Sequence, residues 1–196
     1  MNEPRMDLLD IGETQLYFDL PSSPAVEALL LEAADAYGEP SAETALLRAY
    51  FLAPQQLSVL VGLYRYYFYQ HRMDDALTVA ERAMSNAAQR LSLMPDWRHL
   101  DISHLGAGAQ RSMGLLRFYL LALKASAVVL LRQGKLADAQ ARLNKIVELD
   151  ALDRLGAASL LPFTEAGDDK GAFNELGEPD EFDADGLCAE LTTTTH

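Results

Sequence analysis

The chain has 196 residues, of which 49% are hydrophobic and 23% are charged. This length and composition are typical of a soluble protein with one core or a short stack of repeats, and they exclude a large multidomain enzyme. Acidic residues outnumber basic ones by 29 to 16, which gives a formal net charge of −13.

The charge is unevenly distributed. Residues 1–47 hold ten acids and one base, residues 162–196 hold the same numbers, and residues 48–161 hold fourteen bases and nine acids. An excess of five bases over so long a segment is too small for a surface that follows nucleic-acid phosphates. We therefore expect no nucleic-acid partner.

The N-terminus, MNEPRMDLLD, carries acids where a signal peptide carries bases and then an apolar run. The longest nearly uncharged apolar stretch, 118–131, is shorter than the roughly 18 residues of a membrane span. The single cysteine, Cys188, has no partner for an internal disulfide. These features predict a cytoplasmic protein without a membrane partner.

The first segment in chain order, residues 1–22, is predicted to be an N-terminal arm. Its last part, QLYFDL, alternates weakly between polar and apolar side chains and ends at Pro21, which suits a short extended segment. Beyond it, over 23–161, Ala, Leu, Arg, Glu and Gln dominate and apolar residues recur at spacings of three and four. The sequence therefore predicts a helical domain over 23–161.

Turn-forming residues divide this domain into short helices. The expected breaks fall at 38–41, 53–54, 71–74, around residue 95, at 105–108 and at 133–135. Helices of about ten to fifteen residues between short turns are typical of stacked hairpins. The predicted fold class is all-α, a short stack of antiparallel helical hairpins.

Three segments share a pattern in which a small residue is followed four and seven positions later by further apolar residues. The sets are Ala42, Leu46 and Ala49, then Ala76, Ala80 and Ala83, and finally Ala139, Leu143 and Ile146. The first two sets are 34 residues apart. This resembles the tetratricopeptide repeat (TPR), whose second helix opens on a small residue that lets the two helices of a hairpin approach closely.

The resemblance implies repeats at 23–56, 57–90 and 120–153, with residues 91–119 as an insertion. The chain departs from the TPR pattern in two ways. The aromatic residue expected early in the first helix of each repeat is replaced, and the closing proline is present only in the first repeat, as Pro54. The replacing residues are Val26, Leu60 and Leu123. We expect a turn at Gly106–Gly108, a new helix at Arg111, and an insertion that bends the stack or covers its groove.

The aromatic segment 62–70, GLYRYYFYQ, lies in the first helix of the second repeat. The register places Tyr64 and Tyr67 within the hairpin and other side chains toward a concave groove, which the third repeat extends. Aromatic and arginine side chains are enriched at binding hot spots, and an acidic partner surface complements them. The predicted partner-binding residues are Arg65, Phe68, Tyr69, Arg72, Lys124 and Arg132.

No catalytic residue, cofactor or metal site is predicted. His99 and His104 are five residues apart, which matches neither HxxxH nor HExxH, although a metal-dependent enzyme built on them is a rival hypothesis. Cys188 has no neighbouring base, and the segment 181–186, EFDADG, lacks the bidentate glutamate of a calcium loop. We expect a protein that is not an enzyme.

Residues 162–196 are predicted to be an acidic, mobile C-terminal tail. Its charge is opposite to that of the repeat region. We therefore expect the tail to screen the basic and aromatic side chains predicted along the groove, and so to limit promiscuous binding. Deletion of 168–196 should then raise partner affinity, most strongly at low salt.

Three segments, RYYFYQHRMDDALTVAERAM, PDWRHL and LLRFYLLALKASAVVLLRQGKLADA, resemble the nitrogenase-associated factors, small accessory proteins encoded among nitrogen-fixation genes. The resemblance covers 52–161. It implies a cytoplasmic accessory factor or chaperone that binds nitrogenase molybdenum-iron protein during assembly, repair or protection. The alternative is a chaperone for an exported partner, since acidic three-repeat proteins of this size also resemble the TPR chaperones of type III secretion.

Overall fold

The computed structural model describes residues 20–165. Most of the expected N-terminal arm lies outside these residues. So do Cys188, the segment 181–186 and nearly all of the expected acidic tail with its screening role.

The described residues are all-helical, with eight α-helices and two short 3-10 helices. The α-helices are α1 Pro24–Asp35, α2 Pro40–Leu52, α3 Leu57–Tyr69, α4 Met73–Leu91, α5 Ile102–Arg111, α6 Met113–Arg132, α7 Leu136–Leu149 and α8 Pro162–Glu165. The 3-10 helices are η1 Trp97–His99 and η2 Ala158–Leu160.

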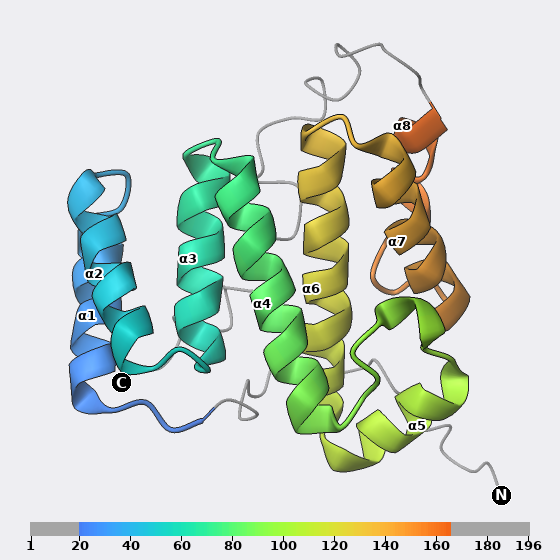
Figure 1. Ribbon diagram of the computed structural model, residues 1–196, viewed down its shortest axis with the longest axis horizontal. Helices are drawn as coiled ribbons and strands as arrows, with labels where there is room; N and C mark the ends of the chain where they lie inside the picture. Colours follow the sequence, from blue (N-terminus) through green and yellow to red (C-terminus); the bar gives the residue numbers. More distant parts are fainter. Residues whose placement is uncertain (1–19, 166–196) are drawn as a thin grey trace, which may run out of the picture.

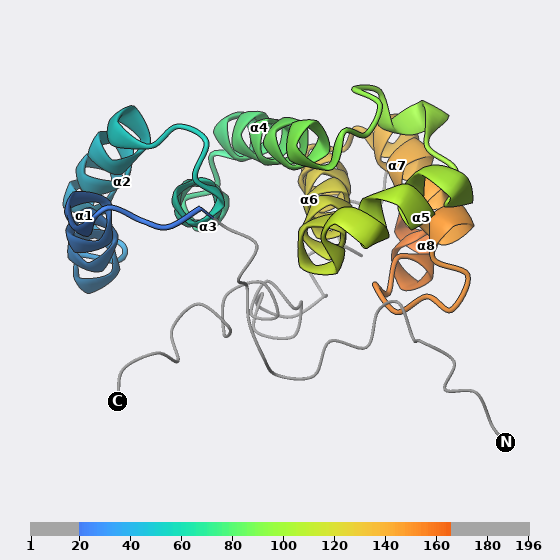
Figure 2. The same ribbon diagram turned by 90° about the horizontal axis from the view of Figure 1, so that it is seen from below.

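The helices form a row in which most contacts join chain neighbours. Helix α1 packs on α2, α2 on α3, α3 on α4 and α6 on α7, while α4 also packs along α6. Figure 1 shows this row running from α1 and α2 at one end to α7 and α8 at the other. Seen from below, α4 lies on one side of the row, and α3 and α6 lie on the other (Figure 2).

The repeated small residues lie in the first turns of α2, α4 and α7. Ala42, Ala76 and Ala139 are completely buried, each with 0% of its surface exposed. A side chain larger than alanine would push apart the helices that meet there. The repeat seen in the sequence thus coincides with the hairpins α1–α2, α3–α4 and α6–α7.

The insertion differs from its prediction. The expected break at 105–108 is wrong, because α5 is helical throughout 102–111 and the next helix begins at Met113. Asp101 caps α5 by accepting a hydrogen bond from the backbone N–H of His104 at 3.0 Å. A Cβ added at Gly108 would lie 3.4 Å from a Leu116 methyl carbon, about van der Waals contact, so α5 packs on α6 at this position.

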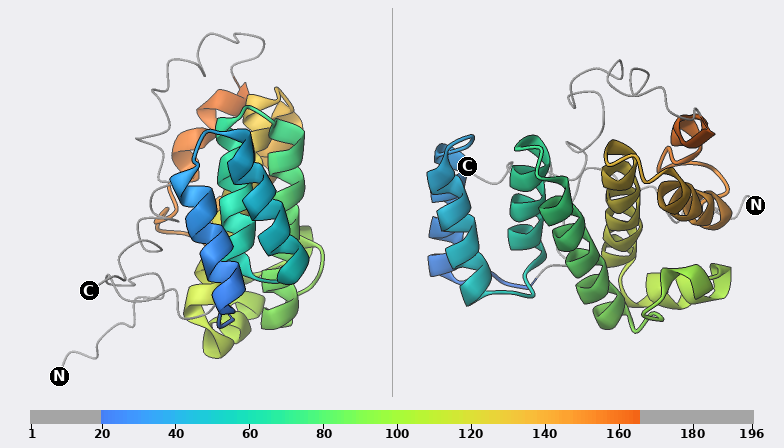
Figure 3. Two further views of the ribbon diagram at one scale, coloured as in Figure 1. Left: turned by 90° about the vertical axis from the view of Figure 1, so that its left-hand side faces the viewer. Right: turned by 45° about the horizontal axis from the view of Figure 1, so that its top comes forward.

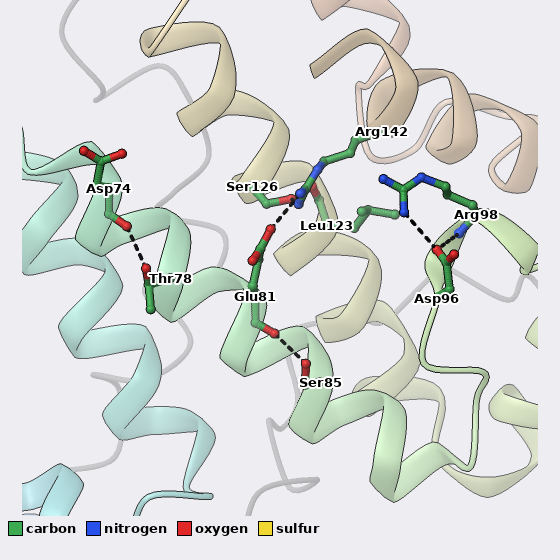
Figure 4. Close-up of polar contacts among 9 residues, drawn as sticks. All are labelled: Asp74, Thr78, Glu81, Ser85, Asp96, Arg98, Leu123, Ser126 and Arg142. Carbon is green, nitrogen blue, oxygen red and sulfur yellow. Dashed lines mark hydrogen bonds and ion pairs between the residues drawn. The ribbon is translucent and has the colours of Figure 1, made fainter. Parts of the chain in front are cut away.

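One arginine ties three helices and the insertion together. Arg142 on α7 lies 2.7 Å from a carboxylate oxygen of Glu81 on α4. It also donates to the Ser126 hydroxyl on α6 at 2.6 Å, as Figure 4 shows. Its guanidinium carbon lies 5.7 Å from the ring centroid of Trp97 in η1. The insertion is therefore anchored where α4, α6 and α7 meet.

Helix α6, Met113–Arg132, is by length and composition the one described helix that could cross a membrane. Most of it is buried within the protein, between α4 and α7. Tyr119 and Leu123 are almost completely covered. The apolar character of α6 is thus accounted for by its place in the core.

Candidate functional site

Helix α3 ends in a row of aromatic side chains. Tyr64 stacks on Phe68 with ring centroids 5.7 Å apart, and Phe68 meets Tyr69 edge-on at 6.0 Å. Tyr37, from the turn between α1 and α2, meets Tyr69 edge-on at 6.0 Å. We call these four residues the aromatic row; such contacts stabilise by about 0.5–1.5 kcal/mol per pair beyond burial.

Arg132 connects the aromatic row to α6. Its guanidinium carbon lies 5.4 Å from the ring centroid of Phe68, within the range of a cation–π contact. Burial raises the pKa of Tyr64 well above its usual value, and the neighbouring Tyr69 adds to the effect while Arg132 opposes it. The aromatic row and Arg132 together define what we call the α3–α6 face.

Two other predicted residues lie on the same helices. Arg65 is half-buried on α3, one turn before Phe68 and Tyr69. Lys124 lies two turns before Arg132 on α6, roughly 12 Å along the axis. Its amine donates to the backbone carbonyl of Leu155, 2.5 Å away, and so holds the loop after α7. Lys124 therefore has a structural contact of its own.

Arg72 lies apart from the aromatic row. It contacts a carboxylate oxygen of Glu43 on α2 and one of Asp75 on α4, each at 2.8 Å. Its guanidinium carbon lies 4.5 Å above the ring of Tyr67, and the two carboxylates raise its pKa. Arg72 thus joins α2, α3 and α4, and the structure does not bring it to the α3–α6 face.

The structure also changes which aromatic residues are available on the predicted binding surface. Phe68, expected on the groove, is only 7% exposed and lies beneath Arg132 rather than open to a partner. Sequence reasoning missed Tyr37, which lies in a turn 32 residues before Tyr69, outside the helical repeat positions. No spacing rule marks such a residue, because its ring reaches α3 only through the tertiary fold.

The two histidines of the insertion each pair with an aspartate. Nδ1 of His104 lies 2.8 Å from Asp101, and Nδ1 of His99 lies 3.4 Å from Asp96. Hydrogen bonds from Ser103 and from the His104 backbone hold the pKa of Asp101 well below its usual value. Within residues 20–165 no group of three or more His, Cys, Asp or Glu side chains could hold a metal ion. The aspartates cap η1 and α5.

Alkaline pH is expected to weaken the fold through its buried tyrosines, which are Tyr67 and Tyr119 in addition to Tyr64. Burial raises the pKa of Tyr67 and of Tyr119 to about 12, and the carboxylates of Glu43 and Asp96, respectively, add to the effect. Their stabilisation is complete below pH 10, where unfolded tyrosine is still neutral, and is lost between about pH 10 and 12. Phenolate absorbance and circular dichroism followed together against pH measure this. Tyr119→Phe should make the loss of stability between about pH 10 and 12 smaller. A variant with the same dependence of stability on pH as the unchanged protein would contradict the prediction.

No protein-family model matches the chain, and no solved structure matches it. The tetratricopeptide assignment therefore stays a prediction. The chain is 49% identical over 156 residues to an uncharacterized 19.8 kDa protein in the nifW 5′ region of Azotobacter chroococcum mcd 1. The alignment covers 80% of this chain and 87% of that relative. At this identity, over most of both sequences, the chain belongs to the same family as the uncharacterized 19.8 kDa protein of the nifW 5′ region.

Proposed function

We propose that the chain is a non-enzymatic, cytoplasmic protein-binding factor of nitrogen fixation that acts as a chaperone or accessory factor for nitrogenase molybdenum-iron protein. The observation that carries the proposal is the relative encoded in the nifW 5′ region, since its nif-gene neighbourhood points to nitrogen fixation. The same observation favours this function over a chaperone of type III secretion.

The hairpins α1–α2, α3–α4 and α6–α7 form, in this proposal, a TPR-like stack. The complete burial of Ala42, Ala76 and Ala139 at equivalent places supports it. Stacked helical hairpins use an extended face to bind other proteins. The insertion packs on the third hairpin, through α5 against α6 and through Trp97 against Arg142 of α7.

The α3–α6 face is the proposed binding surface. It combines the rings of Tyr37, Tyr64 and Tyr69 with the guanidinium groups of Arg65 and Arg132, while Phe68 packs beneath Arg132 and takes no direct part in binding. Helix α4 packs against both α3 and α6. Planar rings bind with little loss of conformational entropy, and guanidinium groups bind carboxylates with paired hydrogen bonds. The partner surface we expect is therefore acidic, with exposed apolar side chains.

A pull-down from nitrogen-fixing cells tests the partner. The tagged full-length chain is captured under native conditions, and the bound proteins are identified by mass spectrometry. We expect the subunits of nitrogenase molybdenum-iron protein at near-stoichiometric amounts. Translocator or effector proteins in their place would contradict the proposal and support the type III secretion alternative.

A triple variant tests the binding surface. Replacing Arg65, Tyr69 and Arg132 with alanine is expected to weaken binding to purified molybdenum-iron protein at least tenfold, about 1.4 kcal/mol. Calorimetry or biolayer interferometry measures the Kd, and the melting temperature shows whether the variant is folded. The matched control is Arg82→Ala, an exposed arginine of α4, which should leave the Kd unchanged. An unchanged Kd in the folded triple variant would place the binding surface elsewhere.

A further inference from the structure

The solvent side of α6 carries a line of basic residues. Most of this helix is buried, and its partly exposed side chains recur at spacings of three and four residues, which places them on one side. Three of them are basic, Arg117, Lys124 and Arg132, and they are separated by roughly 10 and 12 Å along the helix axis. Leu121 and Val128 lie between them. We call these five residues the basic line.

The helices on this side of the row lack negative charge. Neither α3 nor α6 contains an acidic residue, whereas α1, α2, α4 and α7 each contain at least one. Helices α3 and α6 lie on the same side of the row in Figure 2, and Arg65 of α3 adds its charge to those of the basic line. Through Arg132, which lies over the ring of Phe68, the basic line continues into the α3–α6 face.

The segment that follows α8 has the complementary composition. Residues 166–196 hold nine acids and one base, with Phe173, Phe182 and Leu187 placed between the acids. Helix α8, where the described chain ends, packs on α7, which packs on α6; the right view of Figure 3 shows α8 beside α7. The segment's 31 residues span about 100 Å when extended, and α6 is about 30 Å long. The segment is therefore long enough to reach the whole basic line.

We propose that residues 166–196 bind along the basic line of their own chain. Carboxylates of the segment pair with Arg117 and Arg132, and its apolar side chains contact Leu121 and Val128. Because the segment is tethered to the same chain, its effective concentration at α6 is on the order of millimolar, so weak ion pairs are enough to hold it there. The screening expected from the sequence thereby gains a defined surface.

The contact also regulates the proposed binding surface, a consequence that rests on the proposed function. Arg132 belongs both to the basic line and to the α3–α6 face. An acidic partner must therefore displace the segment before it contacts that face. A partner with only a few carboxylates competes poorly, and one with many carboxylates and exposed apolar side chains competes well. The contact within the chain does not itself depend on any partner.

The single cysteine, Cys188, lies in the segment and allows a test in the full-length chain. A nitroxide attached to it broadens the NMR signals of backbone amides that lie close to it, and chemical reduction of the nitroxide restores them. We expect the strongest broadening over residues 117–132 of α6. The broadening should decrease when the salt concentration is raised to about 0.5 M, because exposed charges are then screened within a few ångströms.

Charge reversal tests which side chains hold the segment. Arg117→Glu should reduce the broadening of α6, and Arg117→Glu with Arg132→Glu should remove it. The matched control, Arg82→Glu with Arg98→Glu, reverses two exposed arginines of α4 and η1 and should keep it. The melting temperature shows whether each variant is folded.

Four results would overturn the contact. They are no broadening of α6, broadening confined to another helix, broadening that the charge reversal leaves unchanged, and broadening of an isotope-labelled chain by a nitroxide on a second chain. The last result would mean that the segment binds between chains.

The effect on the partner is measured separately. Arg117 lies about 22 Å from Arg132 along α6, outside the proposed binding surface. Arg117→Ala should therefore raise the affinity for purified molybdenum-iron protein by roughly threefold or more, while Arg82→Ala leaves it unchanged. An unchanged affinity in an Arg117→Ala chain that has lost the nitroxide contact would overturn the regulation. Failure of every variant to bind molybdenum-iron protein would instead contradict the proposed function, and the nitroxide result would still decide the contact within the chain.

Discussion

Replacement of Trp97 with alanine is expected to lower the free energy of unfolding by about 3–5 kcal/mol. Trp97 is buried, and two guanidinium groups lie near its ring centroid, that of Arg98 at 4.7 Å and that of Arg142 at 5.7 Å. Alanine would leave a cavity at the point where the insertion meets α7. It would also remove the apolar surface on which the long side chain of Arg142 rests.

Denaturant unfolding followed by circular dichroism measures this loss, because Trp97 is the only tryptophan and its fluorescence disappears with it. Trp97→Phe should cost less, since phenylalanine fills part of the space. Arg98→Ala is the matched control, because that side chain is 64% exposed and its removal leaves the indole covered by Arg142. A loss below about 1 kcal/mol for Trp97→Ala would mean that the insertion does not depend on this anchor.

Enlarging Ala139 to leucine is expected to destabilise the protein by about 1–3 kcal/mol. Ala139 is completely buried in the first turn of α7, against α6, and has no space for three more carbon atoms. Ala76→Leu should have a similar cost at the start of α4. Thermal and denaturant unfolding of both variants measure the effect.

Ala137→Leu is the control for this prediction, because it makes the same change in the same helix at an exposed position. Its effect on the free energy of unfolding should lie within about 0.5 kcal/mol of zero. Equal stability of the Ala137 and Ala139 variants would show that the small residues are not required for close helix contact.

The hairpins could be predicted from the sequence because their packing requires small residues at fixed positions. Ala42, Ala76 and Ala139 mark the first turn of each second helix, and the spacing of apolar residues marks the buried side. The insertion could not be predicted equally well. Gly106 and Gly108 lower helix propensity, yet α5 forms because Asp101 caps it and Gly108 packs on α6. Those are tertiary effects that local propensity does not contain.

The candidate site shows a similar limit. Helical spacing correctly puts Arg65 and Tyr69 on neighbouring positions of α3, and the match between repeats puts Arg132 on the adjacent α6. Spacing could not show that Phe68 is buried beneath Arg132. Nor could it show that Glu43, 29 residues away in sequence, holds Arg72 on another side of the hairpin.

The bridging arginines also have a consequence for the curvature of the protein. Arg72 reaches back from the second hairpin to Glu43 of the first, and Arg142 reaches back from the third to Glu81 of the second. Partly exposed ion pairs of this kind contribute little free energy, about 0–1 kcal/mol each. Their directional contacts instead resist sliding and rotation of one hairpin along the next. Together with the apolar packing of α2 on α3 and of α4 on α6, they favour one angle between successive hairpins, and with it one shape of the α3–α6 face.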